Sequence, residues 1–343
     1  MKKLTYILLT LLLAGCTGTS RQPQLVAMDS LLLSRPDSAL TLLRGMTFTD
    51  KADRMYHYLL LADACNKCYD TLPSDTILQE VADYYDRHGT PNEQVRAHYL
   101  LGCTYRDMGE APQALNCYQT AVSCADTTSS DCNYRLLMSV YGQMEELFYK
   151  QNLPQDLLEV SNKYSQFALL IQDTLKYIRN LELQTKAYDL MGDTLKMQES
   201  IKTAQKLYKA HGYIEQSTSG NGTLAYIAII RGELSEAKEL MDEYESKSGL
   251  FDSEGNIIKG REGYYYTKGM YYQSQGKLDS AEYYMRKMLN TSNDVDAYRG
   301  LLSVYRERND KDSLVKYVQL YEKAIDAYSN YLQIETVGQM SSM

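Results

Sequence analysis

Histidine and cysteine are the side chains of this sequence best suited to catalysis or metal binding, and their spacing builds no known site. No HExxH motif, GxSxG elbow or Walker loop is present. Cys65 and Cys68 form a CxxC pair, for which a redox or zinc role and a role as buried small hydrophobes or an incidental disulfide are both open. The second is favoured, because no further CxxC, no paired histidines and no βαβ context accompany the pair. We therefore expect no enzyme activity, no cofactor and no metal.

Two other patterns imitate ligand-binding motifs. Residues 220–225 read GxGxxA, but a dinucleotide site needs a β-strand before the first glycine, and here a polar loop precedes it. Asp252, Glu254 and Asn256 alternate like the first ligands of a calcium loop, yet the twelfth position is Gly263 instead of Glu. We expect a helix entry at the first pattern and a turn at the second.

The amino-terminal segment carries a motif with defined chemistry. Lys2 and Lys3 precede an apolar run from Leu4 to Leu13, which is too short to cross a bilayer. The run ends in Leu-Ala-Gly-Cys at residues 13–16. This resembles a bacterial lipobox, whose cysteine thiol accepts a diacylglyceryl group.

The lipobox predicts three parts of the chain. Residues 1–15 are expected to be a cleaved lipoprotein signal peptide, and residues 16–24 a lipidated Cys16 followed by a flexible tether rich in Thr, Gly, Ser and Gln. Residues 25–343 are expected to form one helical domain, held in the cell envelope by acyl chains such as palmitate. The sequence leaves open whether the membrane is the inner or the outer one, and whether the protein lies on the periplasmic or the surface side. Export also permits disulfides, including one between Cys103 and Cys117.

Composition narrows the partner and the fold. The 343 residues contain 44 acidic and 36 basic side chains, and this acidic balance argues against nucleic acid as a partner. Only six prolines leave room for long helices. The aromatic residues are unusual, because there are 32 Tyr, 4 Phe and no Trp. Most aromatic packing must therefore use a ring that carries a hydroxyl group.

A helical repeat organises the body of the chain. It is clearest in residues 95–128, where large and small residues alternate at fixed offsets: His98, Leu101, Gly102, Tyr105, Gly109, Ala114, Tyr118 and Ala121. Small residues let two antiparallel helices approach closely, and large residues, including a packed His98, fill the spaces between hairpins. Gly109 supplies a turn with positive φ. This spacing is similar to the tetratricopeptide (TPR) pattern.

The same frame recurs along the sequence. Further turns are expected at Asn152, Gly192, Gly232, Gly276 and Asn309. Near the amino terminus, Pro36 should begin a helix that buries Ala39, Leu40 and Leu43, and residues 53–66 and 75–87 should form another pair. We expect an all-α, right-handed TPR-like superhelix of about eight antiparallel helical hairpins. Residues 250–261 should be a loop or a small β-like excursion.

The whole pattern resembles TPR lipoproteins and TPR-bearing regulators of Bacteroidetes-type bacteria. The resemblance rests on the lipobox, on residues 35–40 (RPDSAL) and on residues 96–109. In many of those regulators the repeats precede a coiled coil, a membrane helix and a signalling or DNA-binding module. This sequence ends about where the coiled coil would begin. A stand-alone repeat protein and a shortened regulator are both open.

The resemblance also implies a concave groove lined by the first helix of each hairpin. The groove positions are two, five, nine and twelve of each good repeat: Arg96, Tyr99, Cys103 and Arg106; Gly263, Tyr266, Met270 and Gln273; Asp296, Arg299, Ser303 and Arg306. Tyr264 and Tyr271 join this set as candidates, because Tyr265, Tyr272, Tyr298 and Tyr305 take the core positions of the repeat. The Lys and Asn clamp of chaperone-binding TPR domains is absent.

These observations lead to a lipid-anchored, non-enzymatic scaffold or sensory module that binds a protein or peptide. The alternative is a glycan-capturing nutrient-binding lipoprotein, since tyrosine stacks on sugars as well as on peptides. The absence of Trp and of a large non-repeat insertion weighs against glycan capture.

Overall fold

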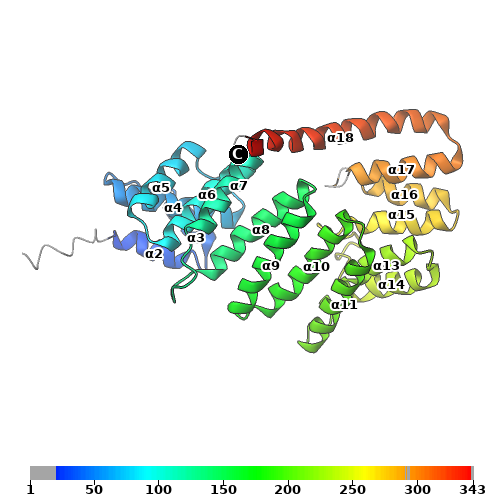
Figure 1. Ribbon diagram of the computed structural model, residues 1–343, viewed down its shortest axis with the longest axis horizontal. Helices are drawn as coiled ribbons and strands as arrows, with labels where there is room; N and C mark the ends of the chain where they lie inside the picture. The colour runs from blue at the N-terminus through cyan, green and yellow to red at the C-terminus, as the bar shows by residue number, and fades with distance from the viewer. Residues whose placement is uncertain (1–20, 290, 292–293, 341–343) are drawn as a thin grey trace, which may run out of the picture. The chain divides into compact units, whose positions relative to one another are not determined.

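The computed structural model describes residues 21–289, 291 and 294–340, with the side chains of the last helix described to Asp326. The predicted signal peptide, Cys16 and the first part of the tether lie outside these residues. The described chain is built from helices and their connections (Figure 1), which confirms the all-α prediction. None of its helices is both long enough and apolar enough to cross a membrane.

The chain separates into two compact units, residues 1–136 and 137–343. The first contains α2 (Pro23–Leu31), α3 (Pro36–Leu43), α4 (Lys51–Cys68), α5 (Asp75–His88), α6 (Pro91–Met108) and α7 (Ala111–Ser123). Helix α8 (Tyr134–Lys150) begins at the boundary between the units. Helical hairpins occur in both units, and the prediction that residues 25–343 form one domain stays a prediction.

The second unit continues the same alternation of helices. It contains α9 (Pro154–Leu170), α10 (Thr174–Leu190), α11 (Thr194–Ala210), α12 (Gln216–Ser219), α13 (Asn221–Ile230), α14 (Leu234–Lys247), α15 (Tyr264–Ser274), α16 (Leu278–Lys287), α17 (Asp294–Arg308) and α18 (Lys311–Met340). Apart from the four-residue α12, the described helices pair into the eight expected hairpins, from α2 with α3 to α17 with α18. Between α14 and α15, an isolated antiparallel bridge joins Phe251 to Ile257, which agrees with the small β-like excursion predicted for residues 250–261.

The turns within the hairpins form where the sequence predicts them. Backbone φ is positive at all six positions: 80° at Gly109, 58° at Asn152, 68° at Gly192, 77° at Gly232, 70° at Gly276 and 58° at Asn309. Glycine and asparagine enter this left-handed region at low cost, so they end one helix and let the next reverse direction. The starts of helices are likewise determined by one or two nearby residues. Pro36 begins α3, and Thr90 and Glu93 form a capping box on α6.

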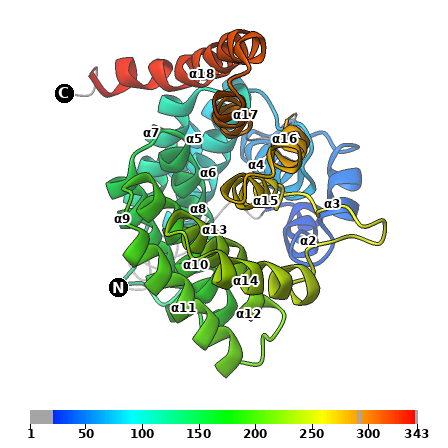
Figure 2. The same ribbon diagram turned by 90° about the vertical axis from the view of Figure 1, so that its right-hand side faces the viewer.

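Small residues bring the two helices of a hairpin together. A Cβ atom added to Gly102 on α6 would lie 2.5 Å from Cε1 of Tyr118 on α7, whose side chain is fully buried. Met285 on α16 occupies the equivalent place between Gly269 on α15 and Gly300 on α17. In the second unit α13, α15 and α17 pack one after another (Figure 2), so the first helices of three successive hairpins form one layer.

Candidate functional site

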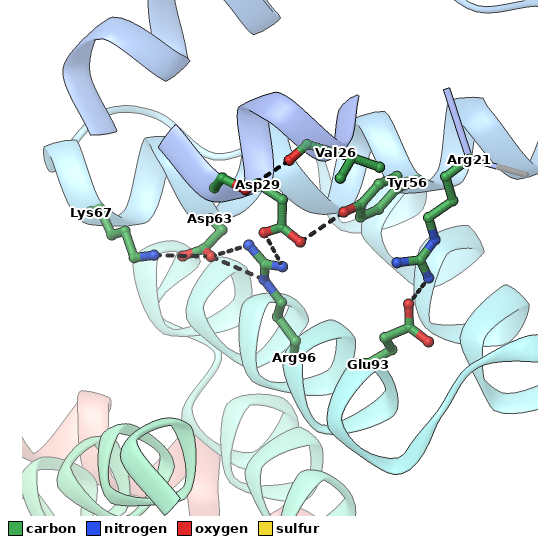
Figure 3. Close-up of polar contacts among 9 residues, drawn as sticks. Arg21, Val26, Asp29, Tyr56, Asp63, Lys67, Glu93 and Arg96 are labelled. Atoms are coloured by element: carbon green, nitrogen blue, oxygen red, sulfur yellow. Dashed lines mark hydrogen bonds and ion pairs between the residues drawn. The ribbon is translucent and has the colours of Figure 1, made fainter. Parts of the chain in front are cut away.

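Arg96 is the centre of a polar network within the first unit (Figure 3). Its guanidinium donates to Asp29 Oδ1 at 2.8 Å and to Asp63 Oδ2 at 2.5 and 3.0 Å. Tyr56 donates to the other oxygen of Asp29 at 2.7 Å, and Lys67 donates to Asp63 at 3.2 Å. The network joins α2, α4 and α6, and only 18% of the Arg96 side chain is exposed.

The charges of this network stabilise one another. Burial alone would lower the pKa of Arg96, but the carboxylates of Asp63 and Asp29 more than reverse this and raise it. Burial alone would likewise raise the pKa of Asp29, and Arg96 and the Tyr56 hydroxyl outweigh it, so that the pKa is lowered. Arg96 is thus fully engaged by internal partners instead of being presented to a ligand.

The other three α6 candidates are also engaged internally. Tyr99 is 7% exposed, and its hydroxyl accepts a hydrogen bond from the Asn66 amide at 3.3 Å. Arg106 pairs with Asp107 at 2.7 Å and lies 3.6 Å from the buried Cys103 sulfur. This helix packs against α4, α5 and α7, so positions that face outward in a single hairpin become internal.

The register expected for the tyrosines of α15 is wrong. Tyr264 and Tyr271, expected to flank the core, are 5% and 7% exposed, whereas Tyr265 and Tyr272 are half-buried. Tyr264 donates to Glu245 Oε1 at 2.8 Å, and its ring centre lies 4.9 Å from that of Tyr244 on α14. Positions seven residues apart share one helix face, and the face of α15 that packs on the preceding hairpin begins at Tyr264.

The remaining candidates of the second unit differ in availability. Met270 packs between two core clusters, and Gln273 donates to Ser303 at 2.9 Å and to Glu307 at 3.0 Å. Arg299 and Arg306 are exposed on α17, and Tyr266 is half-buried on α15. That any of these residues contacts a ligand stays a prediction.

Two of these available residues belong to a larger group, which we name the tyrosine–arginine cluster. Its members come from α10, α13, α15, α17 and α18: Asp189, Tyr226, Tyr266, Asp296, Arg299 and Tyr321. Arg299 Nη1 lies 3.0 Å from Asp296 Oδ1, and although burial alone would lower the pKa of Arg299, the neighbouring Tyr321 and Asp296 raise it. The charges of Asp296, Arg299 and Asp189 all act on the phenol of Tyr266. Side chains from five helices of the second unit therefore lie within electrostatic reach of one another.

The electrostatics of the cluster reflect partial desolvation and opposing charges. Burial, helped by Asp189 and Tyr266, raises the pKa of Tyr226 to about 12. Burial and the neighbouring Asp296 also raise the pKa of Asp189, while Arg299 opposes the increase. The phenols of Tyr226 and Tyr266 thus stay protonated at neutral pH and can donate hydrogen bonds beside a guanidinium and two carboxylates. Such a mixture suits recognition of a polar backbone with charged side chains better than bond cleavage.

The repeat frame could have found two members of the cluster that sequence reasoning missed. Tyr226 lies six residues before the turn at Gly232, the same offset that Met270 has from Gly276. Asp189 lies three residues before the turn at Gly192, the same offset that Gln273 has from Gly276. Applying the groove offsets to the weaker repeats would have named both. Tyr321 is on the second helix of its hairpin, where those offsets give no signal.

The cysteines and the patterns that imitate ligand motifs behave mostly as structural residues. The six cysteines of the described residues form no disulfide, so neither Cys65 with Cys68 nor Cys103 with Cys117 is bridged. Residues 220–225 enter α13 directly after the short helix α12, without a preceding strand. Asp252 caps a turn by accepting from the backbone amides of Glu254 and Asn256 at 2.9 Å. His98 is 7% exposed, as expected of a packed histidine.

No protein-family model and no curated protein matches this sequence. Solved structures with a similar fold include a tetratricopeptide repeat protein from Parabacteroides merdae, with a TM-score of 0.57 and 12% identity over 82% of this chain and 98% of that one. Aspartyl phosphate phosphatase F from Bacillus subtilis also has a TM-score of 0.57, with 13% identity over 89% of this chain and 85% of its own.

A third similar structure is a Rap protein complexed with competence and sporulation factor. Its TM-score is 0.52 at 11% identity, over 90% of this chain and 98% of that one. At such identities the likeness concerns the fold alone. The chain has the all-α, TPR-like fold that its repeat spacing predicts.

Proposed function

We propose that this protein is a non-enzymatic scaffold or sensory module that binds an extended segment of a protein or peptide at the tyrosine–arginine cluster. The observation that carries the proposal is the convergence of Tyr226, Tyr266 and Arg299 from the first helices of successive hairpins. Arg96, Tyr99 and Tyr264, by contrast, are engaged by partners inside the protein.

The cluster has the properties of a peptide-binding surface. Tyrosine offers a large amphipathic contact area at low cost in conformational entropy, and arginine binds carboxylates and backbone carbonyls. The exposed Arg299 is paired with Asp296, so less side-chain freedom is lost when a ligand binds. The Rap protein of similar fold is complexed with competence and sporulation factor, which supports a protein or peptide as the class of partner here.

A displayed library of random peptides, selected on the purified full-length protein, tests this proposal. Selected peptides should bind with an affinity that Arg299→Glu and Tyr266→Ala each lower at least tenfold. Tyr283→Ala is the matched control, because this tyrosine is 52% exposed on the second helix α16 and lies outside the cluster. Lys202→Glu, on the exposed face of α11, controls for reversal of a charge.

The outcomes separate the candidate functions. Peptides that bind both cluster variants as tightly as the wild type would refute binding at this place. A glycan panel run beside the library tests the alternative. Saturable sugar binding that is lost in Tyr266→Ala, without peptide selection, would replace the scaffold by a glycan-capturing protein.

We also propose that Cys16 anchors the protein in the cell envelope. The support is the lipobox at residues 13–16 behind a basic and then apolar leader. Cells grown with a clickable palmitate analogue should label the wild-type protein and not Cys16→Ala, and only the wild type should sediment with membranes. Cys132→Ser is the matched control and should keep the label. Equal labelling of wild type and Cys16→Ala would contradict the anchor.

A further inference from the structure

Three side chains with metal-binding atoms meet in the first unit, outside the tyrosine–arginine cluster. Asp86 lies in the last turn of α5, His98 is in the middle of α6, and Cys124 follows the last residue of α7. One ligand atom from each lies within 4.8 Å of the other two. Among the described residues this is the one group of three or more His, Cys, Asp or Glu side chains that meets this distance.

We propose that Asp86, His98 and Cys124 bind a transition metal ion, and that Zn²⁺ fits them best. Imidazole, thiolate and carboxylate together are typical zinc ligands, whereas Mg²⁺ and Ca²⁺ prefer oxygen alone. Three protein ligands leave a fourth tetrahedral position for water or for a group from outside the protein.

The geometry is close to what the metal requires. Zinc–ligand bonds of about 2.0–2.3 Å place tetrahedral ligand atoms roughly 3.5 Å apart. The present spread of 4.8 Å or less therefore needs movements of about 1 Å, within the reach of side-chain rotation. His98 Nε2 now lies 2.8 Å from Asp86 Oδ1, so a carboxylate already orients the imidazole. The ion would replace this hydrogen bond with two metal bonds.

The burial of the three side chains and their access to solvent also suit metal binding. The His98 side chain is 9% exposed and fixed between helices, while the Asp86 side chain is 45% exposed and Cys124 is half-buried. A metal ion can thus reach the site from solvent and meet a preformed imidazole. On binding, the Cys124 thiol loses its proton to solvent and the sulfur donates an electron pair to the metal. The bound ion would connect α5, α6 and α7.

Cobalt is the probe that detects a thiolate ligand. Reduced, metal-free full-length protein is titrated with Co²⁺, and one equivalent should produce near-ultraviolet thiolate-to-cobalt charge transfer together with visible bands of tetrahedral cobalt. Zn²⁺ should displace the cobalt and raise the melting temperature. Cys124→Ser should abolish the charge-transfer band and weaken Zn²⁺ binding at least tenfold, and Asp86→Asn should weaken it while the band persists.

Matched cysteine variants make the result decisive. Cys132→Ser and Cys16→Ala should keep the spectrum of the wild type, because neither residue belongs to the group. His98→Gln should lose the metal. If that variant unfolds, the partly exposed Cys124 and Asp86 still test the site. No stoichiometric cobalt spectrum at micromolar protein, or a spectrum unchanged in Cys124→Ser, would overturn the proposal and leave Asp86 and His98 as a structural hydrogen bond.

Discussion

Replacing Glu145 by Gln should stabilise the protein at neutral pH. Glu145 lies in α8, is 8% exposed, and its Oε1 atom has no hydrogen-bond partner. Burial raises its pKa from 4.5 to about 7, and the nearby Ser161 hydroxyl and the charge of Lys186 only partly oppose this. A carboxyl group that resists ionisation in the folded state destabilises that state wherever the unfolded chain ionises freely.

The sign and size follow from these two pKa values. Below pH 4.5 Glu145 is protonated in both states and contributes nothing to pH dependence. Between pH 4.5 and about 7 the folded state binds more protons than the unfolded state, so the stability falls as the pH rises. Above pH 7 the full cost of about 3 kcal/mol is present. The Gln variant cannot ionise, so it should gain up to about 3 kcal/mol at pH 8 and nothing at pH 4.

Urea denaturation at pH 4 and pH 8, followed by helical circular dichroism, measures this difference. Glu146→Gln is the matched control, because its neighbouring side chain is 61% exposed, pairs with Lys150, and should change stability by less than about 1 kcal/mol at either pH. Comparison of variant with wild type also cancels other titrating groups, such as Glu182, whose pKa is likewise raised by burial. A Glu145→Gln protein that is less stable at pH 8, or equally changed at both pH values, would refute the reasoning.

Three further predictions concern packing and charge. Gly102→Ala should destabilise the protein by about 1–3 kcal/mol in urea because its Cβ would clash with the Tyr118 ring, whereas the control Gly142→Ala, with 3.5 Å of room, should be neutral or slightly stabilising. Arg96→Met should cost about 3 kcal/mol at pH 7 because it removes the cation shared by two partly buried carboxylates, which then keep only Tyr56 and Lys67 as partners, and the loss should shrink when acid protonates them. Glu282→Gln should show the pH pattern opposite to that of Glu145→Gln. Burial alone would raise the pKa of Glu282, but hydrogen bonds from a tyrosine and two arginines lower it to about 2. The stabilising effect of Glu282 is therefore present above pH 4.5 and is lost as the pH falls toward 2. Thermal melts should show the Glu282→Gln variant destabilised relative to the wild type much more at pH 7 than at pH 2.5.

Features of the fold that depend on local chemistry could be predicted from the sequence. A turn needs a residue that tolerates positive φ, so glycine or asparagine at a fixed offset identified six of the eight turns within hairpins. Helix starts such as Pro36 depend on one or two residues as well. The register of α15 could not be predicted in this way, because adjacent tyrosines all tolerate both core and surface.

The candidate sites could be predicted less well than the turns, because their residues contact partners that are distant in sequence. Arg96 contacts carboxylates 33 and 67 residues away, so its spacing in the repeat could not reveal that it is engaged. Asp86, His98 and Cys124 meet only once α5, α6 and α7 have packed, and no motif joins them in sequence. The tyrosine–arginine cluster is intermediate, because the repeat frame places Tyr226 and Asp189 at groove offsets while their proximity depends on how the hairpins of the second unit pack.

The abundance of tyrosine over phenylalanine also has a structural reason. Four buried or largely buried tyrosines donate to a carboxylate on a different helix: Tyr56 to Asp29 at 2.7 Å, Tyr208 to Glu182 at 2.8 Å, Tyr264 to Glu245 at 2.8 Å, and Tyr305 to Glu282 at 2.6 Å. Each ring fills the space between helices while its hydroxyl stabilises a partly desolvated anion through a charge-assisted hydrogen bond. Phenylalanine would pack equally well but leave the carboxylate without this donor. An acidic chain that must bury some of its carboxylates between helices therefore uses tyrosine as its packing residue.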